Sequence, residues 1–199
     1  MEDAGPTGDS NTCFYAENRR LDNAPAVVIV VWGVSCAGKS TIGRALAHSV
    51  GYNFVDADDL HPKENVDKMA SDRLPWLDVV GAVASKRTPV VVACSALKAV
   101  YRRRLESAMS SRVQAVFVLL HLSREEAERR ATSRTNHFMP PSLLPSQFAA
   151  LEMPSEDEME SGRYKIQSMD GQSVSTIVNE ILATLDLDRS EKGRNTVLS

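Results

Sequence analysis

The chain has 199 residues, of which 43% are hydrophobic and 25% are charged. This length supports one domain with a sizeable core, and a second independent core is not expected. The formal net charge of -3 argues against a general nucleic-acid binder, which would carry a basic surplus. The three cysteines do not make an even-numbered disulfide framework, and no apolar run approaches the roughly 20 residues that span a bilayer. We therefore expect a cytoplasmic protein that binds neither nucleic acid nor membranes.

The composition divides the chain into three parts. Residues 1–24 are polar, mixed in charge and without an apolar signal-peptide core, which predicts a disordered extension. The apolar periodicity that indicates a folded domain covers residues 25–186. Residues 187–199 are charged and are predicted to form a loose tail.

Within the folded part, predicted strands alternate with predicted helices. The first strand is a nearly continuous β-branched run, as expected when both faces of a sheet are covered. Helix starts are marked by prolines and by Ser123, with Glu126 at the capping-box position, and Gly51 ends the first helix. Strands are predicted at 26–32, 53–56, 89–94, 113–120 and 164–167, and helices at 39–50, 62–69, 75–86, 96–109, 124–133, 146–151 and 174–185. This alternation predicts an α/β fold, a five-stranded parallel sheet with helices on both faces.

A glycine-bearing loop between the first strand and the first helix has the pattern Gly-x-x-x-x-Gly-Lys-Ser. Backbone N–H groups of such a loop converge on nucleotide phosphates, and the start of the helix adds partial positive charge. We therefore expect the loop to bind ATP. The expected ATP-binding residues are Gly33, Val34, Ser35, Cys36, Ala37, Gly38, Lys39, Ser40 and Thr41.

The side chains of this loop have separable roles. Lys39 supplies a cation to the bridging phosphates, the Ser40 hydroxyl is a ligand for Mg²⁺, and Thr41 is expected to reach the α-phosphate. Cys36 has two interpretations, a small side chain that the loop tolerates or an oxidation-sensitive thiol beside Lys39.

Acidic residues follow the second predicted strand. They project over the carboxyl edge of the sheet, where ligands bind in open α/β folds. Period-two alternation would aim Asp56 and Asp58 at one site, as a kinase needs for one carboxylate near Mg²⁺ and one near the acceptor hydroxyl. A solvated acidic turn is the competing interpretation of this cluster taken alone.

Several longer strings accompany these two motifs in a fixed order. Together with the phosphate loop, the chain resembles the gluconokinase family, a family of P-loop small-molecule kinases, over about residues 28–185. The strings that carry the resemblance are Asp56–Pro62, Asp72–Leu77, Cys94–Lys98, His137–Pro140, Ser146–Phe148 and Leu151–Glu152.

The resemblance implies phosphorylation of D-gluconate to 6-phospho-D-gluconate with ATP and Mg²⁺. It also implies a nucleoside-monophosphate-kinase-like fold with a mobile lid at about 123–145, and a possible homodimer. By the same likeness Asp58 would face gluconate and Asp56 would hold a Mg²⁺-bound water. Cations for the substrate carboxylate and the transferred phosphoryl group would come from Arg73, Lys98 and Arg102, with Arg130 and Arg134 as lid arginines. His137 and Gln147 also match family positions. His137 is counted among the expected substrate-binding residues, although the chemistry of neither side chain defines its role.

One departure from the family pattern lies beside the expected acceptor site. Only Ala70 and Ser71 separate Met69 from Asp72, where the family usually has a longer loop. This keeps two alternatives open, a kinase of another small hydroxy acid such as shikimate and a catalytically impaired ATP-binding pseudo-enzyme.

Overall fold

The computed structural model describes residues 26–60, 74–133 and 141–185. Its strands are β1 (Ala26–Trp32), β2 (Asn53–Asp56), β3 (Val90–Cys94), β4 (Val113–His121) and β5 (Tyr164–Ser168). They form one sheet in the order β2-β3-β1-β4-β5, and every neighbouring pair is parallel. The predicted five-stranded parallel sheet is confirmed.

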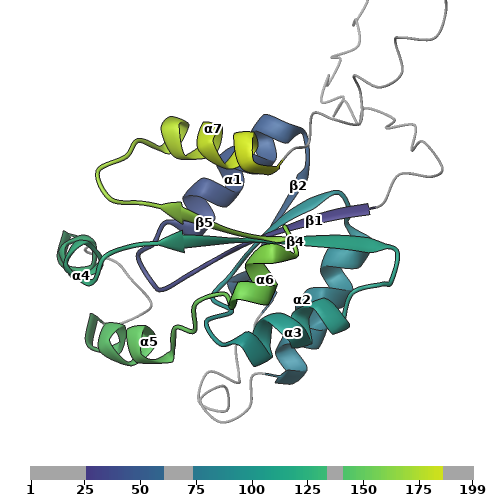
Figure 1. Ribbon diagram of the computed structural model, residues 1–199, viewed down its shortest axis with the longest axis horizontal. Helices are drawn as coiled ribbons and strands as arrows, with labels where there is room; N and C mark the ends of the chain where they lie inside the picture. The colour runs from purple at the N-terminus through teal and green to yellow at the C-terminus, as the bar shows by residue number, and fades with distance from the viewer. Residues whose placement is uncertain (1–25, 61–73, 134–140, 186–199) are drawn as a thin grey trace, which may run out of the picture.

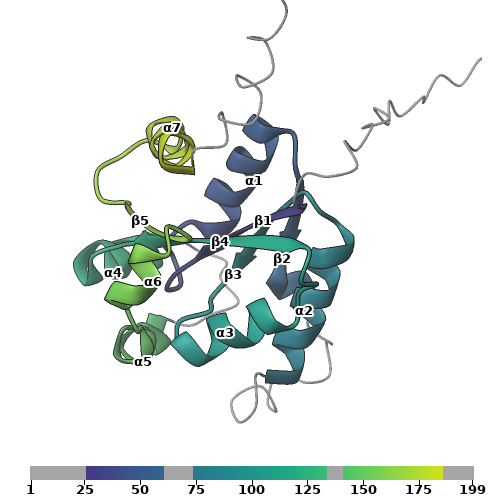
Figure 2. The ribbon, with the colours of Figure 1, turned by 45° about the vertical axis from the view of Figure 1, so that its right-hand side comes forward.

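Helices cover both faces of the sheet. They are α1 (Lys39–Val50), α2 (Leu74–Lys86), α3 (Ala99–Ser107), α4 (Arg124–Ser133), α5 (Leu144–Ala150), α6 (Glu156–Glu160) and α7 (Val174–Leu185), with short 3-10 helices η1 (Ala57–Leu60) and η3 (Pro141–Leu143). Helices α1 and α7 lie on one face and α2 and α3 on the other (Figures 1 and 2). Helices α4 and α5 stand beyond the carboxyl ends of the strands, on the left of Figure 1.

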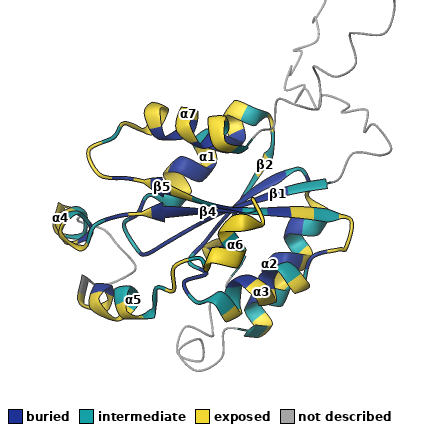
Figure 3. Ribbon diagram, viewed as in Figure 1, coloured by how far each residue is buried: buried dark blue, intermediate teal, exposed yellow. Residues whose placement is uncertain are grey.

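The central strand β1 shows why the sheet is buried on both sides. Val28, Val30 and Trp32 join the core beneath α2 and α3, whereas Ile29 and Val31 join the core beneath α1 and α7. All five side chains are fully buried, and the dark central strands of Figure 3 show the same arrangement. An unbroken apolar run is what a strand covered on both faces requires.

The predicted helices differ from the structure most at α3 and α6. The helix predicted from residue 96 begins three residues later, because Ala96 has a positive φ of 38° and Lys98 is extended. Helix α6 was not predicted. Its signal is nevertheless present, because Ser155 and Glu158 form a capping box at its start.

Some predictions lie outside the described residues. They are the helix at 62–69, the extension at 1–24, the tail at 187–199 and most of the turn-rich part of the expected lid. No helix in the described ranges is long and apolar enough to cross a membrane.

Candidate active site

The phosphate loop leaves the central strand at the carboxyl edge of the sheet. Gly33 has a φ of 146°, and a Cβ there would stand 2.8 Å from the carbonyl oxygen of Leu120. Gly38 has a φ of 91° and is the N-cap of α1, so no side chain caps that helix. Because the first N–H groups of a helix have no partner within the helix, the start of α1 is suited to bind an anion.

The Lys39 side chain curls back over the loop. Its Nζ donates to the carbonyl oxygen of Val34 at 3.0 Å. Burial lowers the pKa of Lys39 below its ordinary value, and the charge of Asp58 is the largest influence in the opposite direction, ahead of Cys94 and Asp56. The ammonium group therefore lies within electrostatic reach of both carboxylates.

Asp56 connects strand β2 to the phosphate loop. Its Oδ2 accepts a hydrogen bond from Ser40 Oγ at 2.6 Å, and its Oδ1 accepts one from the backbone N–H of Asp58 at 3.2 Å. Asp58 lies in η1 and not in an extended segment, so the period-two argument for the two carboxylates was wrong. A 3-10 turn together with the hydrogen bond to Asp56 holds them in proximity.

Ser40 and Asp56 are a suitable donor pair for Mg²⁺. Both present oxygen atoms, the ligand type that this ion prefers, and their hydrogen bond brings the two oxygens together. Within the described ranges no cluster of three His, Cys, Asp or Glu side chains forms a metal cage. The arrangement fits an ion that the protein holds by one or two groups while phosphates and water fill the remaining positions.

Lys98 follows strand β3 at the same edge of the sheet. It is the N-cap of α3, and its Nζ lies 5.9 Å from the centroid of the Tyr101 ring. The side chain is partly exposed. Strand β3 lies between β1, which leads into the phosphate loop, and β2, which ends at Asp56. Because Lys98 follows the end of β3, it is on the same side of the phosphate loop as Asp56.

Arg102 does not lie where a substrate contact needs it. Its side chain is fully buried, and its guanidinium stacks 4.3 Å above the Trp32 ring. It donates to the carbonyl oxygens of Leu97 and Glu152 and forms an ion pair with Glu158 at 3.3 Å. The predicted contact between Arg102 and the substrate is therefore corrected to a structural role. The guanidinium interacts with groups of the protein itself and is not exposed to a ligand.

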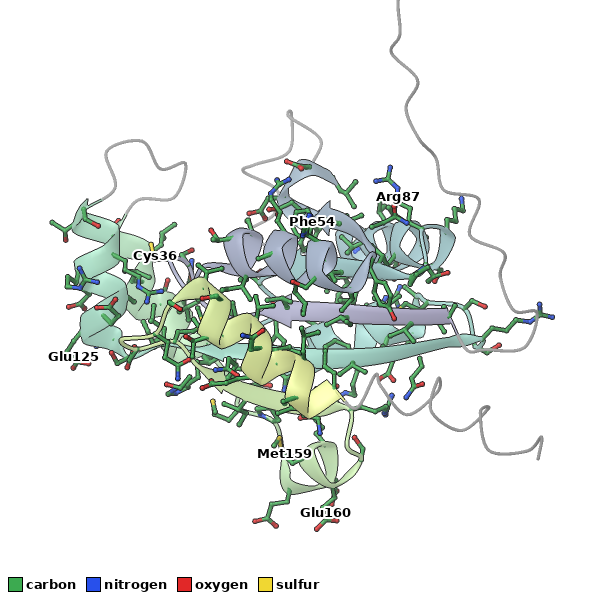
Figure 4. The ribbon with its side chains drawn as sticks, turned by 90° about the horizontal axis from the view of Figure 1, so that it is seen from above. Cys36, Phe54, Arg87, Glu125, Met159 and Glu160 are labelled. Atoms are coloured by element: carbon green, nitrogen blue, oxygen red, sulfur yellow. The ribbon has the colours of Figure 1, made fainter. Side chains whose placement is uncertain are left out.

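Arg130 reaches the phosphate loop from α4. Its Nη1 lies 3.5 Å from the carbonyl oxygen of Cys36, its Nη2 donates to Met169 O at 3.0 Å, and its Nε donates to Glu126. Cys36 lies between the α4 end of the molecule and α1 (Figure 4) and has a positive φ of 64°. The expected lid arginine thus stands beside the loop that it was predicted to serve.

Glu126 holds Arg130 in this position. Hydrogen bonds from Arg129 and then Arg130 lower the pKa of Glu126 from 4.5 to about 2. The capping box predicted for α4 is half formed. Ser123 Oγ accepts from Glu126 N, but Ser123 N donates to Asp170 instead of to Glu126.

Gln147 is the site residue whose role the sequence did not reveal. From α5, its Oε1 accepts from Ser35 N at 2.7 Å and its Nε2 donates to Ser35 Oγ at 2.9 Å. The contact joins residues 112 positions apart, so only tertiary structure shows it. Arg73, Arg134 and His137 lie outside the described residues.

Comparisons with known proteins show which proteins this chain is similar to. The family model described as shikimate kinase matches residues 35–186. A probable gluconokinase from Dictyostelium discoideum is 35% identical over 83% of this chain and 89% of its own length. A gluconokinase from Arabidopsis thaliana is 38% identical over 78% of this chain and 90% of its own length.

The chain is also similar to a solved structure of a gluconokinase. The crystal structure of a gluconokinase from Sinorhizobium meliloti superimposes with a TM-score of 0.69 at 40% identity. The match covers 82% of this chain and 94% of that one.

Proposed function

This chain belongs to the gluconokinase family of shikimate-kinase-like enzymes, and on that premise we propose that it transfers the γ-phosphoryl group of ATP to D-gluconate. The product would be 6-phospho-D-gluconate. One observation of the structure supports the proposal most directly. Lys39, the pair of Ser40 and Asp56, and Asp58 gather at the carboxyl edge of one parallel sheet.

The phosphate loop would bind the nucleotide. The uncapped start of α1 offers backbone N–H groups and partial positive charge to the phosphates. Lys39 would exchange its contact with the Val34 carbonyl for the phosphate oxygens. A preorganised cation in a site that excludes water stabilises the charge that develops during transfer.

Mg²⁺ would be held by Ser40 directly and by Asp56 directly or through water. When bound with ATP, the ion supplies positive charge to the phosphate oxygens. The task of Asp56 in this proposal is to orient the Ser40 hydroxyl, which donates to it at 2.6 Å.

The acceptor would enter beside Asp58. This carboxylate is exposed, and we propose that it orients the terminal hydroxyl of gluconate and accepts its proton. Gluconate is an anion that must approach the negative charges of ATP, so cations are needed nearby. Lys98 lies on this side of the site, and Arg73 is proposed for the same task from the sequence.

The lid, which includes α4, would complete the site from the side of the phosphate loop that is opposite to Asp58. Arg130 already contacts the phosphate loop through Cys36 O, and Arg134 follows one helical turn later in the sequence. Closure of such a segment would bring both cations to the phosphates and exclude water.

A coupled assay of ADP release tests the proposed function. Purified protein is incubated with ATP and Mg²⁺ and with gluconate, shikimate or no acceptor. The expected result is ADP release that depends on gluconate and exceeds the rate with shikimate. Shikimate is included because the matching family model is that of shikimate kinase. Nucleotide binding without release for any acceptor would contradict the proposal and favour the pseudo-enzyme.

The two carboxylates should fail in different ways. Asp58→Asn removes the proton acceptor while it preserves size, so transfer to gluconate should fall by on the order of a hundredfold with ATP binding unchanged. Asp56→Asn weakens the proposed Mg²⁺ site of Ser40 and Asp56, so the Mg²⁺ concentration that gives the half-maximal rate should rise. Titration of the rate with Mg²⁺ checks both variants. Identical Mg²⁺ dependence and identical residual rates would contradict the separate roles.

A further inference from the structure

A short segment at the end of α5 is bonded to both sides of the site. At one end, the Gln147 carboxamide makes two hydrogen bonds to Ser35, one to its backbone N–H and one to its hydroxyl. Both functional groups of the carboxamide are therefore used on a single residue of the phosphate loop. A two-point contact of this kind holds the position and the orientation of Ser35 together.

The other end of the segment holds the start of α3. Glu152 Oε2 accepts a hydrogen bond from Ala99 N at 2.7 Å, and Glu152 N donates to Leu97 O at 2.9 Å. Helix α3 receives no cap from its own N-cap residue, Lys98. The Glu152 carboxylate caps it instead, from 53 residues away. A negative charge at a helix start is also favourable for the helix dipole.

The part of the segment between these two residues is seated in the protein. Phe148 packs against the core beneath α1 and α7, and Leu151 packs against both cores. In addition, the Glu152 carbonyl accepts from the buried Arg102 at 3.0 Å. Residues 147–152 therefore form a fixed brace, with the phosphate loop at one end and the backbone that carries Lys98 at the other.

We propose that Gln147 and Glu152 are positioning residues at the two ends of this brace. Gln147 sets the phosphate loop for ATP, and Glu152 sets Lys98 for the acceptor. The assignment of the Glu152 end to the acceptor rests on the proposed function. Neither residue touches the reacting atoms, so each acts through the loop that it holds.

The proposal makes a crossed prediction for two alanine variants. Gln147→Ala loses two hydrogen bonds to the phosphate loop, so Ser35 is no longer held in the orientation that suits the nucleotide phosphates. The Kd and KM for ATP should therefore rise about tenfold, while the KM for gluconate changes less than about twofold. Glu152→Ala should do the reverse. It should lower kcat/KM for gluconate about tenfold and leave the Kd for ATP near the wild-type value.

Conservative variants separate positioning from folding. Glu152→Gln keeps an oxygen that can accept from Ala99 N, so it should recover most of the gluconate kcat/KM. Gln147→Glu can keep both contacts, with the Ser35 hydroxyl now as donor, but it brings a negative charge near the phosphates. Its thermal midpoint should stay near the wild-type value while its Kd for ATP rises.

Matched controls are available on the surface. Gln114→Ala and Glu160→Ala alter exposed residues of the same types, and Figure 4 shows Glu160 on α6, far from the phosphate loop. Both should leave all constants unchanged. ATP binding is measured by calorimetry in the absence of acceptor, and gluconate constants come from the ADP-release assay.

Three outcomes would overturn the proposal. The first is wild-type constants in both alanine variants. The second is an equal loss for both substrates that follows the thermal midpoint, which is the behaviour of a purely structural brace. The third is a reversed pattern, with Gln147 acting on gluconate. If the wild-type protein phosphorylates no gluconate, the proposed function and the Glu152 half fail together, but calorimetry with ATP still decides the Gln147 half.

Discussion

Lys39 illustrates how a single residue depends on its surroundings. Burial lowers its pKa, and the Asp58 and Asp56 carboxylates oppose that effect. Lys39→Met should keep the fold because the hydrogen bond of the Lys39 side chain within the described residues goes to a loop carbonyl, which solvent can satisfy. Turnover should nevertheless fall by on the order of a hundredfold or more, because one preorganised charge contact is lost.

The measurement for Lys39→Met is kcat with saturating substrates, together with circular dichroism and the thermal midpoint. Lys86→Met serves as the control, since Lys86 is an exposed cation in the last turn of α2. A folded Lys39→Met protein with wild-type turnover would contradict the assignment of the phosphate loop.

Arg102, unlike Lys39, has a structural role instead of a direct role at the site. The resemblance to gluconokinases implies that Arg102 is a cation for the substrate. In the structure its charge is enclosed by Trp32, Glu158 and backbone carbonyls. A buried guanidinium needs such partners because its desolvation is costly. Its contribution to the site is therefore indirect, through the backbone of residues 97 and 152.

At the scale of elements, helix α4 depends on the Glu126 carboxylate. Its pKa is about 2 in the folded protein and 4.5 ordinarily. A lowered carboxyl pKa means that the unfolded chain binds the proton more readily. The stabilisation is therefore fully present above about pH 4.5 and is lost as the pH falls toward 2.

Glu126→Gln tests this dependence. Chemical denaturation between pH 2 and pH 6 should show that the difference in unfolding free energy between wild type and variant shrinks as the pH falls. The variant also releases Arg130 from its ion pair, so the KM for ATP should rise modestly at neutral pH. A difference in unfolding free energy that does not change over this range would contradict the pairing.

Helices α2 and α3 approach each other closely at Gly81. A Cβ at this position would lie 2.7 Å from the Cβ of Ala108 and 2.8 Å from the carbonyl oxygen of Leu105. Gly81→Ala should therefore separate the two helices and lower the free energy of unfolding by about 1–3 kcal/mol. Denaturant titration checks this value. Ala82→Ser, at the exposed neighbouring position, should change it by less than about 0.5 kcal/mol.

At the scale of the whole molecule, the short sequence between Met69 and Asp72 bears on acceptor binding. This segment lies outside the described residues. Insertion of a loop of the family's length should lower the KM for gluconate and change kcat less, because uniform binding affects KM whereas Lys39 and the lid arginines act in the transition state. Kinetics of the insertion variant with gluconate check this. A large rise in kcat with unchanged KM would contradict it.

The phosphate loop and the alternation of strands and helices could be predicted because both are local. Apolar periodicity and the placement of glycines predict a strand at 26–32 and a helix at 39–50. Strand β1 and helix α1 have those bounds. The homodimer and the cytoplasmic location stay predictions. So do the roles of Arg73, Arg134 and His137, which lie outside the described residues.

The sequence by itself determined most of the elements, the parallel sheet, the phosphate loop and the family. Only the tertiary structure decided that Arg102 is enclosed and that Gln147 and Glu152 bond to the two loops of the site. The physical reason is the range of the interactions. Periodicity and capping act within about one helical turn, whereas the bonds of Gln147 and Glu152 join residues 112 and 53 positions apart.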